Sequence, residues 1–189
     1  MSNKHVYIIH GYAASPTDHW FPWLKQKLET QGATVTVLAL PDSQSPTVEA
    51  WDQYLKNNVA LPDKNTFFVA HSLGCITLLR YLSALPEHSR VGGITIVSGF
   101  AEPLQERPQL NPFVKEGYAV EKVKRISGQY DVIASKNDSI VPYVLTKHLA
   151  QQLGANLTSL ENGGHFLARE GFQQFDTVYD VVERQMNAR

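Results

Sequence analysis

The sequence contains one cysteine, Cys75, among its 189 residues. A single cysteine forms no intramolecular disulfide and supplies neither a multi-cysteine zinc site nor an iron-sulfur site. A disulfide-stabilised secreted scaffold is therefore excluded, and the expected environment is reducing. The other candidate ligands, the histidines, show no spacing typical of zinc binding. We expect no metal and no cofactor.

Runs of basic residues and long apolar runs are also missing. The 17 Lys and Arg residues balance 18 Asp and Glu residues, for a formal net charge of −1. This balance, without a run of basic residues, gives no positively charged segment that would bind nucleic acid or an anionic membrane. Near the N-terminus the apolar run covers only residues 6–9, too short for a signal-peptide core or a membrane span. We expect a soluble cytoplasmic protein that binds neither nucleic acid nor membranes.

The chain shows no internal repeat, low-complexity tract or linker, so its length predicts a single domain over residues 1–189. Short apolar runs rich in β-branched or aromatic residues recur along it and predict strands, several of them covered on both faces. These runs are residues 6–9, 34–38, 66–70, 93–97, 130–134 and 156–160.

Segments with apolar residues three and four apart lie between these runs and predict helices. The predicted apolar faces are Trp20, Trp23, Leu24 and Leu28; Val48, Trp51, Leu55 and Val59; Ile76, Leu79, Leu82 and Leu85; Leu145, Leu149 and Leu153; and Phe172, Phe175, Val178, Tyr179 and Val182. Strands that alternate with helices predict parallel strands joined by right-handed crossovers. The expected fold is a three-layer α/β/α sandwich.

One stretch, residues 98–122, does not follow this pattern. It carries Pro103, Pro108 and Pro112 and has weak apolar periodicity, which predicts an irregular excursion with one short helix. Ligands of open α/β sheets bind at the carboxyl ends of the strands, and the excursion leaves from such an end. It is therefore expected to border a site. Because only about 25 residues are left for a cap, we expect an open, shallow site that suits small substrates.

A candidate nucleophile follows the predicted strand 66–70. The sequence Ala70-His71-Ser72-Leu73-Gly74 matches the nucleophile-elbow pattern small-x-Ser-x-Gly, directly between a strand and a helix. Small residues two positions either side of the serine allow the sharp turn that exposes its hydroxyl. Ser72 is therefore the predicted nucleophile, and it needs a base and a carboxylate to activate it.

The two partners of this serine are expected in the chain order Asp or Glu, then His. Asp138 follows the strand 130–134, and His165 follows the strand 156–160, so both are predicted on loops at the end of the sheet where Ser72 emerges. Asp131 competes with Asp138, but it begins its strand and is expected at the opposite edge. We predict the catalytic residues Ser72, Asp138 and His165.

Stabilising an oxyanion requires two converging N–H donors. The amide of Leu73 is one predicted donor, and the loop after the first strand supplies the other. In that loop the amide of Tyr12 is the preferred donor and that of Ala13 the alternative, while Gly11 permits the tight turn.

Some residues near these loops are weaker candidates. The substrate-binding candidates are His10, Gly11, Ala13, His71, Phe100 and Phe166. His10 is expected to brace the oxyanion loop, and His71 to pack behind the nucleophile with its side chain directed away from the reacting centre. Cys75 is an alternative nucleophile because it lies near a helix N-terminus, although its position after the elbow glycine is typical of a small core residue.

Together these motifs resemble the small α/β-hydrolases of the YdeN type, relatives of retinoblastoma-binding protein nine. The segments that carry the resemblance are His10-Gly11-Tyr12, Ala70 to Gly74, Ser135 to Pro142, and Gly163-Gly164-His165-Phe166. It extends from about Val6 to the final helix. The resemblance implies an α/β-hydrolase fold with about six mostly parallel strands in the order 2-1-3-4-5-6 and no large cap domain. It also implies a Ser-Asp-His triad at Ser72, Asp138 and His165.

The predicted function is that of a serine hydrolase, most simply a carboxylic-ester hydrolase that acts on small acyl substrates through an acyl-enzyme. Two alternatives remain. The chain could bind a protein partner on a hydrolase scaffold, because fold does not fix function, or its triad could cleave amides or thioesters.

Overall fold

The computed structural model describes residues 4–188. Its centre is a sheet of six parallel strands in the order β2-β1-β3-β4-β5-β6, which confirms the predicted fold class. The strands are β1 His5–Ile9, β2 Thr34–Leu38, β3 Thr66–His71, β4 Gly93–Val97, β5 Tyr130–Ser135 and β6 Asn156–Leu160. Each predicted run corresponds to one strand to within a residue at either end.

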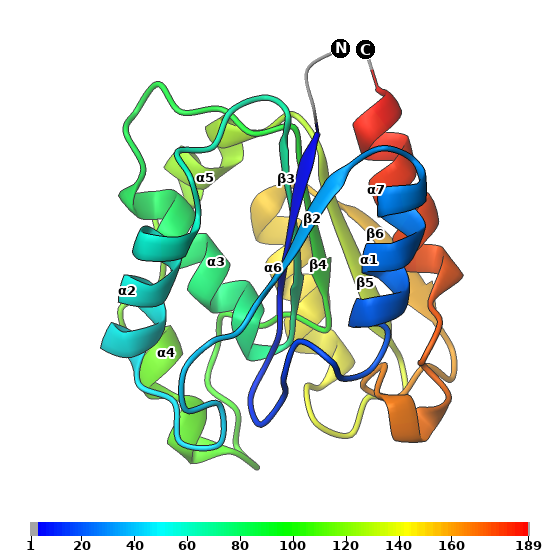
Figure 1. Ribbon diagram of the computed structural model, residues 1–189. Helices are drawn as coiled ribbons and strands as arrows, with labels where there is room; N and C mark the ends of the chain where they lie inside the picture. The colour runs from blue at the N-terminus through cyan, green and yellow to red at the C-terminus, as the bar shows by residue number, and fades with distance from the viewer. Residues whose placement is uncertain (1–3, 189) are drawn as a thin grey trace.

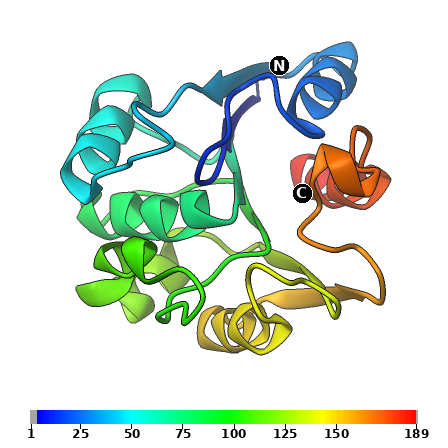
Figure 2. The same ribbon diagram turned by 90° about the horizontal axis from the view of Figure 1, so that it is seen from below.

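Helices cover both faces of the sheet (Figure 1). The helices are α1 Phe21–Thr30, α2 Val48–Asn58, α3 Leu73–Ala84, α4 Pro112–Lys115, α5 Val120–Ile126, α6 Tyr143–Leu153 and α7 Asp176–Asn187. Figure 2 shows α1 and α7 together on one face and the other helices on the opposite face. No helix within residues 4–188 is long and apolar enough to cross a membrane.

Two apolar clusters, one on each face, hold the helices to the sheet. On one face Trp51 and Leu55 of α2 pack with α3 and the sheet, and both are fully buried. On the other face Leu24 of α1 packs with Val178 and Val182 of α7. Helix α3 is buried around most of its circumference because it lies between the sheet and both α2 and α5. The N-terminus of this central helix is thereby held against the end of β3.

Local signals set several helix ends. The side chain of Thr47 accepts a hydrogen bond from the amide of Ala50 at 3.3 Å and caps α2. Pro142 immediately precedes α6, and Gly154 ends it in the left-handed conformation at φ 64°. The last helix differs from the prediction, since it begins at Asp176 and leaves Phe172 and Phe175 in the preceding loop.

The excursion 98–122 holds more helix than the one short segment predicted. It contains a 3₁₀ turn, η1 (Pro108–Leu110), then α4, and it runs into α5. Pro108 and Pro112 each begin one of these short helical segments, where a missing N–H costs no hydrogen bond. The prolines that suggested irregular chain thus start helical turns, and apolar contacts of Leu110 and Phe113 hold the segment on the core.

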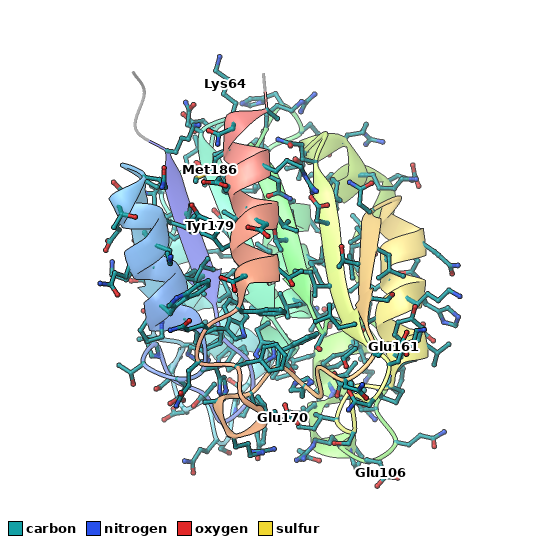
Figure 3. The ribbon with its side chains drawn as sticks, turned by 90° about the vertical axis from the view of Figure 1, so that its right-hand side faces the viewer. Lys64, Glu106, Glu161, Glu170, Tyr179 and Met186 are labelled. Atoms are coloured by element: carbon teal, nitrogen blue, oxygen red, sulfur yellow. The ribbon has the colours of Figure 1, made fainter. Side chains whose placement is uncertain are left out.

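All six strands point the same way, so their carboxyl ends form one edge of the sheet, at the bottom of Figure 1. In Figure 3 the labelled Glu106 and Glu170 lie at this end of the molecule, and Lys64 and Met186 lie at the other. A second 3₁₀ turn, η2 (Ala168–Glu170), also lies near this edge, in the connection between β6 and α7. The loops that leave this edge carry the predicted site.

Candidate functional site

Ser72 forms the sharp turn between β3 and α3. Its backbone has φ 55° and ψ −124°, a conformation that a non-glycine residue rarely adopts. Space at this turn is tight, because a β-carbon at Gly74 would lie 2.4 Å from the carbonyl oxygen of His10, and one at Gly11 would lie 2.8 Å from the β-carbon of Ser72. Glycine at these two positions therefore lets the loop after β1 pass directly beside Ser72.

Asp138 and His165 lie on loops at the same edge, and the structure brings them together. Nδ1 of His165 lies 2.8 Å from Oδ2 of Asp138, and both side chains are almost completely buried. A carboxylate only accepts hydrogen bonds, so Nδ1 must donate, and whenever the ring carries a single proton Nε2 has the lone pair. Ser72 and His165 line the same cavity. The imidazole thus has the tautomer that a general base requires.

The carboxylate of Asp138 is held by four hydrogen bonds. Oδ1 accepts from the amides of Ile140 and Val141 at 2.8 and 2.9 Å. Oδ2 accepts from His165 and from Oγ of Ser98, the latter at 2.9 Å. All four acceptor positions of the carboxylate are in use, so its orientation toward the imidazole is fixed.

Ser98 was absent from the predicted site. It follows β4 directly, at the same edge of the sheet where Ser72 and Asp138 follow their strands, and its backbone φ is 47°. A small hydroxyl residue directly after a buried strand was the available signal. A position with positive φ that orients a charged partner is typical of a functional site.

The loop that carries His165 is clamped to the loop that carries Asp138. Oγ of Ser135 accepts from the amide of Gly163 at 2.8 Å, and Oδ1 of Asn137 accepts from the amide of Gly164 at 2.7 Å. Gly164 has φ 55°, and a β-carbon there would lie 2.5 Å from the carboxylate of Glu170. That carboxylate accepts from the amide of His165 at 2.8 Å. The glycine pair therefore permits both the turn of the loop and the close approach of the Glu170 carboxylate.

His71 contacts both the backbone and the imidazole ring of His165. Its Nε2 donates to the carbonyl oxygen of His165 at 2.9 Å, and its ring lies 4.9 Å from the His165 ring between centroids. Burial, with a smaller contribution from the nearby His165, lowers the pKa of His71 well below its usual value. A neutral His71 adds no charge beside the His165 imidazole. The expected packing role agrees with these contacts, but the prediction that the side chain is directed away from the site is wrong, because its ring lies against the His165 ring and His71 lines the cavity.

Two backbone amides in the loop after β1, those of Tyr12 and Ala13, differ in whether they have a hydrogen-bond acceptor. The amide of Ala13 donates to the carbonyl oxygen of Ser43 at 2.7 Å, so the alternative oxyanion donor is already engaged. The amide of Tyr12 has no acceptor among the described residues, and Tyr12 lines the cavity. Leu73 is the first residue of α3, and its amide has no acceptor within the helix. The geometry leaves the two preferred donors, Tyr12 and Leu73, unengaged.

His10 does not line the cavity, which corrects its prediction as a substrate-binding candidate. Its side chain is 1% exposed, with Nδ1 bonded to the carbonyl oxygen of Gly11 at 2.9 Å. Nε2 accepts from the amide of Leu40 at 3.1 Å, so the proton must be on Nδ1. Burial lowers the pKa of His10. As the sequence predicted, this residue braces the loop that carries Tyr12.

Phe100 and Phe166 are corrected as well. Phe100 is fully buried in the cluster that contains α3, and Phe166 stacks on Phe175 with ring centroids 4.7 Å apart. Neither residue lines the cavity. Each follows a strand, as the predicted catalytic residues do, but its side chain turns inward because a large apolar ring gains more from burial than from exposure.

Cys75 lies in the core and not at the site. The side chain is fully buried beside Gly99, and its Sγ donates to the carbonyl oxygen of Val97 at 3.7 Å. Burial raises the pKa of this thiol, which disfavours the nucleophilic thiolate. The alternative cysteine nucleophile is therefore contradicted.

Asp131 lies near the amino end of β5, away from the site. Its carboxylate accepts from Nε2 of Gln185 at 2.7 Å and from Nδ2 of Asn156 at 3.2 Å, and it contacts Arg184. These contacts tie α7 and β6 to the sheet. The residue therefore has a structural role that is separate from the Asp138–His165 pair.

The cavity beside Ser72 has a volume of about 240 Å³, below the roughly 300–1,000 Å³ typical of small-molecule pockets. Ser72 is 6% exposed and His165 3% exposed, and the excursion forms one wall. The site is thus more enclosed than the open, shallow surface predicted, because the excursion folds over the edge of the sheet. The lining residues are Gly11, Tyr12, Ala13, Ala14, His19, His71, Ser72, Leu104, Arg107, Leu110, Ile140, His165, Leu167 and Arg169.

Eight of these lining residues were not among the predicted site residues, and three of the eight, His19, Arg107 and Arg169, have polar side chains. Nδ1 of His19 accepts from the amide of Ala168 at 3.1 Å, and burial lowers its pKa. His19 and Arg107 lie on loops and Arg169 lies in η2. The path of these segments depends on tertiary contacts, so no local pattern marks the three residues. Within residues 4–188 no group of three or more His, Cys, Asp or Glu side chains is placed to hold a metal ion.

A parallel sheet in the order 2-1-3-4-5-6, with a serine elbow after its third strand, defines an α/β-hydrolase. The family is also shown by sequence, since residues 6–184 match the family model described as serine hydrolase. The chain belongs to that family.

Two comparisons concern YdeN of Bacillus subtilis strain 168. The chain is 44% identical to that protein over 179 residues, which cover 95% of this chain and 94% of YdeN. The crystal structure of the ydeN gene product has a TM-score of 0.96 at 42% identity, covering 98% of this chain and all of the other. The sequence resemblance to the YdeN type is confirmed.

A more distant structure shows the fold alone. A lipase-esterase related protein from Clostridium acetobutylicum has a TM-score of 0.69 at 16% identity, with 96% of this chain and 93% of that one covered. The α/β-hydrolase architecture therefore persists where little sequence similarity is left.

Proposed function

We propose that this serine hydrolase cleaves small carboxylic esters with Ser72 as nucleophile, His165 as general base and acid, and Asp138 as the group that orients the imidazole. The observation that carries the proposal is the 2.8 Å contact between His165 Nδ1 and Asp138 Oδ2 beside a cavity that Ser72 also lines. The strained elbow at Ser72 supports it, because that turn exposes the hydroxyl to the cavity.

In the acylation step Oγ of Ser72 attacks the ester carbonyl carbon while its proton passes to Nε2 of His165. The amides of Tyr12 and Leu73 stabilise the negative charge on the carbonyl oxygen. The carbon–oxygen bond to the alcohol then breaks, and the imidazolium returns the proton to the leaving alkoxide. Asp138 stabilises the imidazolium and keeps its own charge.

In the second step His165 removes a proton from water as the water attacks the acyl carbon. The bond from that carbon to Ser72 breaks, and the proton returns to the serine. The products are a carboxylic acid, an alcohol and the free enzyme. The small cavity suits short acyl groups, and the family membership supports a small-molecule substrate over a protein partner.

A fluorophosphonate probe tests the nucleophile. We expect the wild type to be labelled promptly and Ser72→Ala not to be labelled, because the probe forms its bond with an activated serine. Hydrolysis of p-nitrophenyl acetate should fall by at least about 1,000-fold in the same variant. Ser45→Ala, at an exposed serine that does not line the cavity, is the matched control and should behave as the wild type.

Failure of the folded wild type to react with the probe would contradict the proposal and favour a partner-binding role. A panel of short esters, thioesters and amino-acid anilides then defines the bond. Faster turnover of thioesters or anilides than of esters would keep the triad and overturn the ester assignment.

A further inference from the structure

The cavity beside Ser72 carries positive charge that the triad does not use. Arg107 comes from the excursion 98–122 and Arg169 from η2, and both line the cavity. Among the lining residues that the structure describes there is no Asp or Glu. A guanidinium stays protonated throughout the physiological pH range, so this charge is permanent.

Neither guanidinium is committed elsewhere in the fold. The other four arginines within residues 4–188 each contact an acceptor in the protein: Arg80 binds Asp52, Arg90 binds the carbonyl oxygen of Ser89, Arg125 faces Glu87 and Arg184 contacts Asp131. By contrast, the described structure contains no ion pair or hydrogen bond for the side chain of Arg107 or Arg169. Their five N–H donors each are available to a ligand.

The acidic neighbours of these arginines in the sequence, Glu106 and Glu170, form no ion pair with either guanidinium in the described structure. Glu170 directs Oε2 to the amides of His165 and Leu167, at 2.8 and 3.0 Å. Glu106 is exposed and lies at the lower periphery of the molecule in Figure 3, outside the cavity lining. Burial lowers the pKa of the lining residue His19, so this histidine adds little charge to the cavity at neutral pH.

Most of the remaining lining side chains are apolar. Leu104, Leu110, Ile140 and Leu167 supply aliphatic walls of the same cavity. A short aliphatic chain fits this surface, and an anionic group at the end of that chain meets guanidinium donors that match carboxylate geometry.

We propose that the preferred substrate is a short-chain ester that carries a carboxylate, bound by Arg107 and Arg169. This inference rests on the proposed ester hydrolase and names its substrate class. The carboxylate belongs either to the acyl group or to the alcohol, and matched esters separate these two cases.

Two pairs of esters test the preference. For an anionic acyl group, mono-p-nitrophenyl glutarate is compared with p-nitrophenyl methyl glutarate, which has the same chain without the charge. For an anionic leaving alcohol, 4-acetoxybenzoate is compared with its methyl ester. We expect kcat/KM of the charged member in at least one pair to fall tenfold or more in Arg107→Gln and in Arg169→Gln. The neutral members should change by less than twofold.

The ratio of variant to wild type is taken for each ester, so differences in intrinsic reactivity cancel. Arg90→Gln, remote from the cavity, is the matched control and should leave all four esters unchanged. Thermal melting verifies that each variant is folded. Raising the salt concentration provides a measurement without mutation, because it should lower wild-type kcat/KM for the charged ester and not for the neutral one.

Each result has a separate meaning. Wild-type hydrolysis of the neutral esters, with no loss specific to charged esters in either arginine variant, would overturn the carboxylate inference and leave the ester hydrolase standing. Absence of hydrolysis of all four esters, together with no fluorophosphonate labelling of Ser72, would overturn both proposals.

Discussion

At the scale of single residues, the site depends on hydrogen-bond partners that are distant in sequence. Asp138 and His165 are 27 residues apart and meet at 2.8 Å, and Ser98, directly after the neighbouring strand β4, donates a second side-chain hydrogen bond to the same carboxylate oxygen. Strand order and loop position sufficed to select Asp138 over Asp131. They did not reveal Ser98, because one serine after a strand resembles any other polar loop residue.

Replacing the two candidate carboxylates separates their roles. In Asp138→Asn we expect kcat for a small ester to fall by about 1,000-fold or more, because an amide nitrogen beside Nδ1 disfavours the required tautomer. In Asp131→Asn we expect kcat per folded molecule to stay within about twofold, with lower stability from weakened buried contacts. Steady-state kinetics and urea unfolding of both variants supply the measurement. Equal losses of kcat would refute the assignment of Asp138.

At the scale of elements, the loop after β1 and the turn into α3 determine each other's shape. Gly11 lies so close to Ser72 that no β-carbon fits, and Gly74 is equally close to the end of β1. The sequence predicted that both glycines serve tight turns. Their contact with each other's segments follows only from the pairing of β1 with β3, in which Ile9 lies opposite Ala70.

A β-carbon at Gly11 should therefore damage catalysis. In Gly11→Ala the new atom would lie 2.8 Å from the β-carbon of Ser72 and 3.1 Å from the carbonyl oxygen of His71, so the loop must move. Displacing the Tyr12 amide should reduce kcat by about 100-fold, the usual loss for one oxyanion donor. Gly128→Ala is the matched control, because a β-carbon there would meet no atom of a residue beyond its chain neighbours within 4 Å. Equal activity of the two variants would contradict the role of the loop.

At the scale of the whole molecule, two buried histidines connect stability to pH. Burial lowers the pKa of His10 below 6.5 and that of His71 well below it. The unfolded chain takes up protons on both residues as the pH falls through about 6.5, and the folded chain does not. The contribution of these two histidines to the free energy of unfolding is therefore fully present above this pH and should decrease as the solution becomes acidic.

Urea unfolding between pH 8 and pH 5 measures this effect. We expect the free energy of unfolding to decline below about pH 6.5, by at most about 1.4 kcal/mol per pH unit for each histidine. Imidazole NMR signals of the folded protein assign the effect, since those of His10 and His71 should stay in the neutral form below that pH. Ordinary titration of either ring near 6.5 in the folded state would disprove the prediction.

The sequence by itself determined the strands, most helices and the three residues of the proposed triad. Strand runs and the elbow pattern are local, because apolar periodicity and the small residues around Ser72 act over a few neighbouring positions. The path of residues 98–122 and of the loop before α7 was decided by tertiary structure, because contacts between distant segments set it. Those contacts buried Phe100 and Phe166, enclosed the cavity, and brought Arg107 and Arg169 to its lining.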